Sequence, residues 1–89
     1  MKIVFKKRFA KDLKQISYDH KLLERVKQII AHFERVDDTG QIPNLKKLRA
    51  QGDYYRIRSG EYRIGMIIEN DTVTFVRVLH RRQIYRFLP

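Results

Sequence analysis

The sequence predicts an α+β fold in which a helical hairpin packs on one face of a mainly antiparallel sheet. Two stretches in the first half repeat apolar residues at the 3.6-residue period of a helix. Three stretches in the second half alternate apolar and polar residues as strands do, and short clusters of Ser, Gly, Asn and Asp separate them. The expected order is β-α-α-β-β-β with a short closing helix or turn. At 89 residues, we expect one domain that spans residues 1–89.

The first half begins with residues 2–6, which alternate as a short strand. A first helix follows, because apolar residues recur at i, i+4 and i+7 in Phe9, Leu13 and Ile16. Ser17 and Asp19 are N-cap residue types that end this helix and begin the next. The second helix has the clearest pattern, which runs through Leu22, Val26, Ile29, Ile30 and Phe33 and stops near residues 37–40. Both apolar stripes are interpreted as core.

The second half opens with a connection over residues 41–52 and continues with strands at 54–58, 61–69 and 72–79. Ser59-Gly60 and Asn70-Asp71 are suitable two-residue hairpin loops. A short turn or helix is expected at 81–87. These loops set which side chains share a face of the sheet, because side chains alternate with a period of two.

With Ser59-Gly60 as the loop, Arg56 pairs with Arg63, and Arg58 lies on the same face, away from the helices. Like charges directly opposite are destabilising, so this cluster predicts a bound anion between them. A one-residue slip would split the cluster. The second loop places Arg77 on the helix side, where a bulge or a snorkelling side chain would be needed.

The charge of the chain favours a polyanionic partner. The formal net charge is +10, and residues 46–89 carry ten basic but only four acidic side chains. The chain has no Cys, which excludes disulfides and thiolate zinc sites. It has no apolar run near the roughly 18 residues of a membrane span, and its start is too short and polar for a signal peptide. We therefore expect a cytoplasmic protein without a membrane partner.

Several residue types suited to phosphate chemistry gather near the end of the sequence. Arg holds phosphate oxygens with a planar fork but is a poor base, so His80 is the natural acid–base group. Tyr85 lies four residues after Arg81, and one helical turn would bring both to one edge. The basic strands have no carboxylate pair for two-metal hydrolysis, and no Gly-rich loop precedes a helix. Attack of an RNA 2′-hydroxyl on the adjacent phosphorus needs only clamps, an acid and a base, so no cofactor or metal is expected.

In these segments the chain resembles the RelE/ParE superfamily of bacterial type II toxins. The matching pieces are Leu-Lys-Lys-Leu at 45–48, Tyr-Tyr-Arg-Ile-Arg at 54–58, Gly-Glu-Tyr-Arg-Ile at 60–64 and His-Arg-Arg-Gln-Ile-Tyr-Arg at 80–86. The resemblance covers almost the whole chain. It implies a toxin that cleaves mRNA in the A site of the 70S ribosome and forms a hetero-oligomer with a cognate antitoxin. The ending at residues 80–86 favours the RelE branch over the ParE branch, which inhibits DNA gyrase and is no nuclease.

The resemblance also implies site residues. Basic residues of RelE-like members match the positions Arg56, Arg58, Arg63 and Arg81, and their C-terminal Tyr matches Tyr85. The best-known RelE members have Lys on the strand that corresponds to residues 54–58. Arg at both position 56 and position 58 therefore shifts the expected acid–base role toward His80. Other cations are expected to contact RNA or the ribosome: Lys46, Lys47, Arg49, Arg82 and Arg86. A gyrase inhibitor and a non-catalytic RNA-binding module are the alternatives, and the sequence names neither codon preference nor antitoxin.

Overall fold

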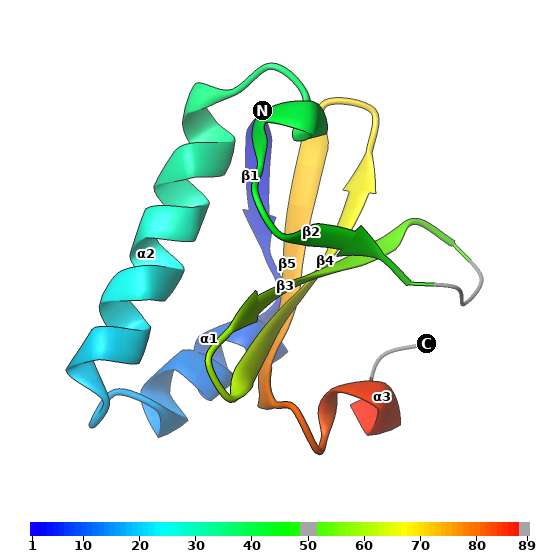
Figure 1. The fold of residues 1–89 in the computed structure, drawn as a ribbon. Helices are drawn as coiled ribbons and strands as arrows, with labels where there is room; N and C mark the ends of the chain where they lie inside the picture. Colours follow the sequence, from blue (N-terminus) through cyan, green and yellow to red (C-terminus); the bar gives the residue numbers. More distant parts are fainter. Residues whose placement is uncertain (49–51, 88–89) are drawn as a thin grey trace.

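The computed structural model describes residues 1–48 and 52–87, with the backbone alone at 85 and 87. Two helices cover one face of a five-stranded sheet, and a short third helix lies at the foot of the sheet, apart from the other two (Figure 1). The elements in chain order are β1 (Lys2–Phe5), α1 (Lys7–Gln15), α2 (His20–Arg35), the 3-10 turn η1 (Thr39–Gln41), β2 (Leu45–Lys47), β3 (Tyr54–Ser59), β4 (Tyr62–Glu69), β5 (Thr72–His80) and α3 (Ile84–Phe87).

The predicted fold class is confirmed. The strand order is β1-β5-β4-β3-β2, in which β1 runs parallel to β5 and the other pairs are antiparallel. The short strand β2 lies inside the predicted connection over residues 41–52 and pairs with the outer edge of β3. Within the described residues, no helix has the length and apolar character needed to cross a membrane.

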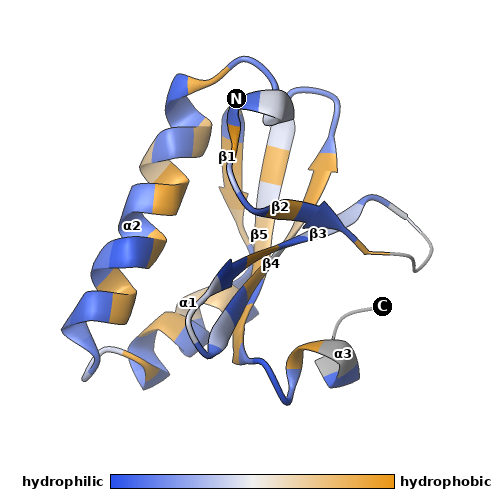
Figure 2. Ribbon diagram, in the orientation of Figure 1, coloured by the Kyte–Doolittle hydropathy of each residue, from blue (hydrophilic) through white to orange (hydrophobic). Residues whose placement is uncertain are grey.

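The helices form where the apolar period placed them. Asp19 is the N-cap of α2, and its carboxylate accepts a hydrogen bond from the Leu22 backbone N–H at 3.0 Å, as its residue type predicts. Figure 2 shows the apolar stripe of α2 facing the sheet and its polar side facing away. Because this stripe carries fully buried Val26 and Phe33, tertiary packing rather than helix propensity holds α2 in place.

The sheet carries apolar clusters on both faces. The main core lies beneath α1 and α2, where Phe75 of β5 contacts Phe9 and Phe33 with ring centroids 5.4 and 5.7 Å apart. The other face of the sheet, here called the open face, carries a smaller cluster, in which Leu79 packs with Ile84 of α3. This cluster consists of Leu48, Leu79 and Ile84, with Tyr54 and Val76 packed against it.

The predicted register of the first hairpin is wrong by one loop position. Its loop is Gly60-Glu61, so Arg58 pairs with Arg63, and Arg56 pairs with Gly65. Gly60 has a φ of 61°, and a glycine at the first central position is what a type II′ turn requires. Moving the two-residue loop by one position shifts the strand pairing by two residues. Arg56, Arg58 and Arg63 therefore still share one face of the sheet, and the cluster is not split.

The second hairpin has the predicted Asn70-Asp71 loop, and Glu69 pairs with Thr72. A bulge between Gly65 and Met66 then shifts the register, so Arg77 pairs with Gly65 and Val76 is the additional residue. This bulge resolves the awkward placement of Arg77.

Arg77 binds a buried carboxylate on α1. Its Nε lies 2.9 Å and one Nη 3.2 Å from the two oxygens of Asp12, which also accepts the Val78 backbone N–H at 2.9 Å. Asp12 therefore satisfies the backbone of β5 at an edge that β1, which pairs only as far as Phe75, leaves uncovered.

Candidate functional site

The candidate site lies where the β3–β4 turn meets the end of β5. In this corner Arg58, Arg63 and Leu79 stand side by side on three adjacent strands, and Tyr62 pairs with His80. The chain then leaves β5 through Arg81, whose backbone N–H donates to the Glu61 carbonyl oxygen at 2.7 Å. The sheet thus brings two stretches of the predicted site together that are nearly twenty residues apart in sequence.

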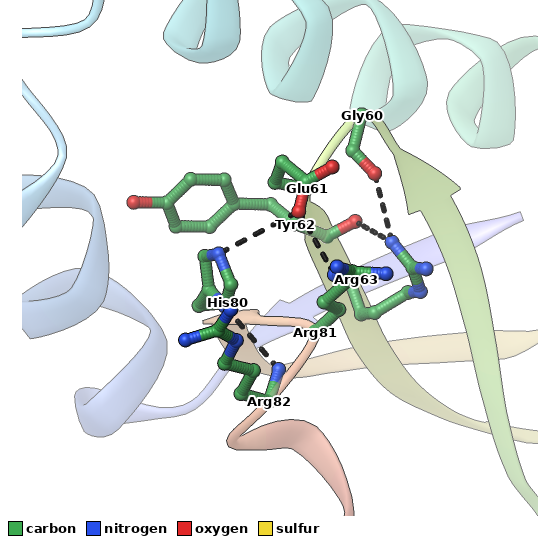
Figure 3. Close-up of polar contacts among 7 residues, drawn as sticks. All are labelled: Gly60, Glu61, Tyr62, Arg63, His80, Arg81 and Arg82. Carbon is green, nitrogen blue, oxygen red and sulfur yellow. Dashed lines mark hydrogen bonds and ion pairs between the residues drawn. The ribbon is translucent and has the colours of Figure 1, made fainter.

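Glu61 is the centre of the polar contacts in this corner (Figure 3). Its Oε2 forms an ion pair with Arg81 Nε at 2.8 Å and lies 3.8 Å from His80 Nε2. The Arg81 and Glu61 side chains are 51% and 64% exposed, so solvent screens the pair and it contributes at most about 1 kcal/mol. The contact therefore orients Arg81 more than it stabilises the fold.

Sequence reasoning did not assign a role to Glu61. The available signal was its position as the single acidic residue within the basic stretch from 56 to 63. Such an acid lies among cations whatever the register, but only the contact between the turn and the end of β5 selects Arg81 as its partner.

His80 lies on the opposite sheet face from Arg63, contrary to its expected place beside the basic face. It shares a face with Tyr62, and the two rings meet edge to face with centroids 5.7 Å apart. Its Nδ1 accepts a hydrogen bond from the Arg82 backbone N–H at 3.3 Å. Nδ1 is therefore the unprotonated nitrogen of the neutral ring, and Nε2, which points toward Glu61, carries the hydrogen.

The pKa of Tyr62 is raised above its ordinary value. The main cause is a hydrogen bond with the Tyr18 hydroxyl, and burial adds to it because the phenolate is the charged form. Tyr62 therefore stays protonated at neutral pH and acts here as a ring that supports His80.

The predicted hairpin placed Arg63 on an exposed face, but the residue is buried. It is 9% exposed, and its Nη1 donates to the carbonyl oxygens of Gly60 and Tyr62, both at 2.9 Å. The Arg63 side chain turns back toward these two carbonyl oxygens, which act as acceptors for its positive charge. The repulsion from Arg58 across the strand pair is thereby offset without an anion.

The other two arginines of the cluster differ in exposure. Arg58 is exposed at the end of β3, whereas Arg56 is half-buried opposite Gly65. The Nε of Arg56 is buried and has no hydrogen-bond partner within the described residues. Among the four arginines predicted to be catalytic, Arg58 and Arg81 are therefore the two that are open to a ligand.

The C-terminal segment differs from the predicted helical turn. Residues 81–83 form turns and α3 begins only at Ile84, so Arg81 and Tyr85 are not one turn apart on a helix. The Tyr85 side chain and Arg49 lie outside the described residues. The remaining predicted contact residues are exposed: Lys46, Lys47, Arg82 and Arg86.

Lys47 has local partners on the outer edge of the sheet. Its Nζ lies 3.7 Å from Asp53 and 5.9 Å from the centroid of the Tyr55 ring. Across the described residues, no three His, Asp or Glu side chains gather as metal ligands would.

Comparison with known proteins identifies the family and the fold. Residues 3–85 match the family described as the ParE toxin of the type II toxin–antitoxin system parDE. The chain is also 41% identical over 90 residues to Toxin RelE3 of Methanocaldococcus jannaschii, with all of both chains covered. The chain belongs to the RelE/ParE superfamily of type II toxins. Its 41% identity with a RelE protein makes it RelE-like within that superfamily.

Solved structures of such toxins have the same fold. The toxin resembles the RelB–RelE antitoxin–toxin complex from Methanococcus jannaschii with a TM-score of 0.82 and 38% identity, covering 97% of this chain and 99% of that one. YafQ from E. coli matches with a TM-score of 0.76 at 14% identity, covering 93% and 96% of the two chains. At that low identity, the likeness to YafQ concerns the fold alone.

Proposed function

We propose that this toxin is a ribosome-dependent endoribonuclease that cleaves mRNA and thereby inhibits translation. The observation that carries the proposal is the corner in which Glu61 holds Arg81 beside His80, with exposed Arg58 nearby. Likeness to RelE over the whole chain supports the same reading.

Arg81 has the geometry of a phosphate clamp. Glu61 forms an ion pair with its Nε, and the Arg81 side chain makes no hydrogen bond within the described residues. Its two terminal nitrogens can therefore bind a phosphate as a fork while Glu61 fixes the direction of the guanidinium. Arg58 offers a second exposed cation, and two such contacts stabilise the charge that develops on phosphorus.

In the proposed reaction, the RNA 2′-hydroxyl oxygen bonds to the adjacent phosphorus while the bond to the 5′-oxygen breaks. The 2′-hydroxyl loses its proton to solvent water, the 5′-oxygen gains one from a general acid, and a 2′,3′-cyclic phosphate remains. The side chains of the corner are cations, an imidazole and one carboxylate, which suits this metal-independent route. His80 lies on the other sheet face from Arg58 but is the last residue of β5, and its proposed role is to donate the Nε2 proton toward the leaving oxygen or a phosphate oxygen at this strand end.

The other predicted site residues take supporting roles. Arg63 sets the β3–β4 turn and so positions Glu61 and Arg81. Arg56 and Tyr85 are proposed to contact the nucleotide. The exposed cations Lys46, Lys47, Arg82 and Arg86, together with Arg49, are proposed to bind ribosomal or messenger RNA.

The proposed partner besides the ribosome is a cognate antitoxin, in a hetero-oligomer within the cytoplasm. A charge of +10 leaves the free toxin attractive to any nucleic acid, and an acidic antitoxin segment would neutralise it. A RelE protein that this chain resembles was solved together with RelB. We expect the acidic segment to pair with Arg58 or Arg81, the exposed arginines of the corner.

Single-turnover cleavage on mRNA-programmed 70S ribosomes tests the proposal. Arg81→Ala should slow cleavage by about 10²–10³-fold, the usual effect of losing one transition-state contact. Arg35→Ala, which removes an exposed arginine from the far end of α2, is the matched control and should cleave normally. Normal cleavage by Arg81→Ala, or products without a 2′,3′-cyclic phosphate, would contradict the mechanism.

A gyrase inhibitor is the second candidate, because the family match bears the ParE name. Under this alternative, the wild-type toxin blocks DNA supercoiling by purified gyrase and leaves ribosome-bound mRNA intact. A non-catalytic RNA-binding module would do neither, although it would still bind RNA.

A further inference from the structure

We propose that a cleft on the open face, separate from the candidate site, binds a nucleotide of the same RNA strand, away from the cleaved bond. The inference rests on the proposed function, because it takes RNA as the ligand. The cleft has a volume of about 470 Å³ and is called the Tyr54 cleft here. Its lining residues are Lys6, Arg8, Tyr54, Ile67, Val76 and Arg77.

The Tyr54 cleft combines an apolar floor with a cationic rim. Tyr54, Ile67 and Val76 come from three adjacent strands, and each is half-buried, so their surfaces remain accessible to a ligand. The Tyr54 ring also packs against the cluster under α3, which holds it in place. A fixed aromatic ring with aliphatic neighbours is a platform on which a base of any sequence can stack.

The rim of the cleft holds positive charge that the protein itself leaves uncompensated. Lys6 and Arg8 are exposed and form no ion pair within the described residues, whereas Arg77 is held by Asp12. They flank the start of α1, where cations oppose the helix dipole and the first turn has no acidic residue and no side-chain cap. A phosphate between Lys6 and Arg8 would relieve this unfavourable arrangement.

The position of the cleft suits the strand that the candidate site would cleave. Tyr54 and Arg58 lie on the same face of β3, four residues apart, which is about 13 Å along an extended strand. A segment of a few nucleotides bridges this distance. The cleft would therefore hold a neighbouring nucleotide while Arg58 and Arg81 hold the reacting phosphate.

The geometry favours RNA over an acidic peptide. An extended peptide binds a sheet by adding to a free strand edge, but the floor residues lie on β3, β4 and β5, inside the sheet order. The Tyr54 carbonyl oxygen already accepts the Leu48 backbone N–H at 2.9 Å. The cleft offers a ligand side chains rather than backbone, which is what stacked bases and phosphates use.

Equilibrium binding of a fluorescein-labelled RNA hexamer, made uncleavable by 2′-O-methyl groups, tests the inference with the full-length toxin. The double variant Lys6→Ala/Arg8→Ala should lower the slope of log affinity against log salt by about 0.7, since the one phosphate held between the two cations contributes about 0.7 on a single strand. The control Lys7→Ala/Lys11→Ala removes the same charge from exposed residues of α1 outside the cleft and should change the slope much less.

A second pair of variants tests stacking. Tyr54→Leu should weaken RNA binding by about tenfold, and Tyr54→Phe, which keeps the ring, should bind normally. Equal loss in the two double variants, or normal binding by Tyr54→Leu, would overturn the cleft as an RNA site. Unchanged RNA binding by Lys6→Ala/Arg8→Ala together with weaker antitoxin binding would assign the cleft to the antitoxin and also overturn the inference.

The outcome is separable from that of the proposed function. If wild-type toxin leaves ribosomal mRNA intact but the cleft variants still lose RNA binding as described, the nuclease proposal fails and the cleft stands. If Arg81→Ala abolishes cleavage while the cleft variants bind RNA as their controls do, the nuclease stands and the cleft fails.

Discussion

Replacing Asp12 with alanine should lower the free energy of unfolding by about 3–5 kcal/mol, the usual cost of removing one partner of a buried ion pair. The Arg77 and Asp12 side chains are only 12% and 6% exposed, and two hydrogen bonds of 2.9 and 3.2 Å join them. Alanine would remove the Asp12 carboxylate from the largely buried guanidinium and leave the Val78 N–H without its bond to that carboxylate. Stabilities of small domains are about 5–15 kcal/mol, so this is a large fraction.

Urea denaturation followed by circular dichroism measures the effect. We expect the midpoint to fall by about 2 M or more, given slopes of about 1–1.5 kcal/mol/M for a small protein. The melting temperature should fall by at least about 12 °C, at about 4 °C or more per kcal/mol. Asp37→Ala, which removes an exposed carboxylate, is the control and should change stability by less than about 0.5 kcal/mol.

A double variant separates the lost pair from lost packing. Asp12→Leu/Arg77→Met removes both charges, so it should be more stable than Asp12→Ala, which keeps the largely buried guanidinium but removes its carboxylate partner. The reasoning is refuted if Asp12→Ala is as stable as the Asp37→Ala control, or if removing Arg77 as well makes the protein less stable still.

Three further predictions concern the candidate site. Glu61→Gln should bind RNA about two- to fivefold more tightly, because a carboxylate near the bound phosphate is removed, and should cleave more slowly, because Arg81 loses the ion pair that orients it. Fluorescence anisotropy measures the binding and single-turnover kinetics the cleavage, and unchanged cleavage would show that Glu61 does not position Arg81. His80→Gln should slow cleavage by about 10²–10⁴-fold with little change in ribosome binding and should flatten the pH–rate profile; an unaltered profile would leave His80 a structural role. Tyr18→Phe should lower the pKa of Tyr62 toward its ordinary value. The raised phenol pKa of Tyr62 contributes stability below about pH 10, and this stability is lost as pH rises through the folded-state pKa. Titration of phenolate absorbance and alkaline unfolding should therefore both differ between the wild type and Tyr18→Phe, and identical curves would contradict the Tyr18 contact.

Local patterns in the sequence determine most of the fold. The helical period of α2, the Asp19 cap and the alternation of the strands depend only on neighbours within about one or two turns, so they can be read from residue spacing. The common face of Arg56, Arg58 and Arg63 also follows from spacing. Side chains alternate with a period of two, so a shift of the pairing by two residues leaves these arginines on the same face.

Register and partners depend on energies that spacing does not contain. Ser59-Gly60 and Gly60-Glu61 both suit a two-residue loop, and the choice depends on which central position the glycine takes. The bulge beside Val76 depends on packing of β5 against α1 and β4, which the alternation of β5 alone does not reveal.

The sequence by itself determined the helices, every strand except β2, their order, the basic character of the second half and the resemblance to RelE-like toxins, because each is carried by residues close together in the chain. Only the tertiary structure decided that Arg77 binds Asp12, 65 residues away, that Glu61 holds Arg81, and that Arg63 is buried in its own turn. A charged side chain binds whichever opposite charge or carbonyl lies within about 3 Å, and folding alone sets those distances.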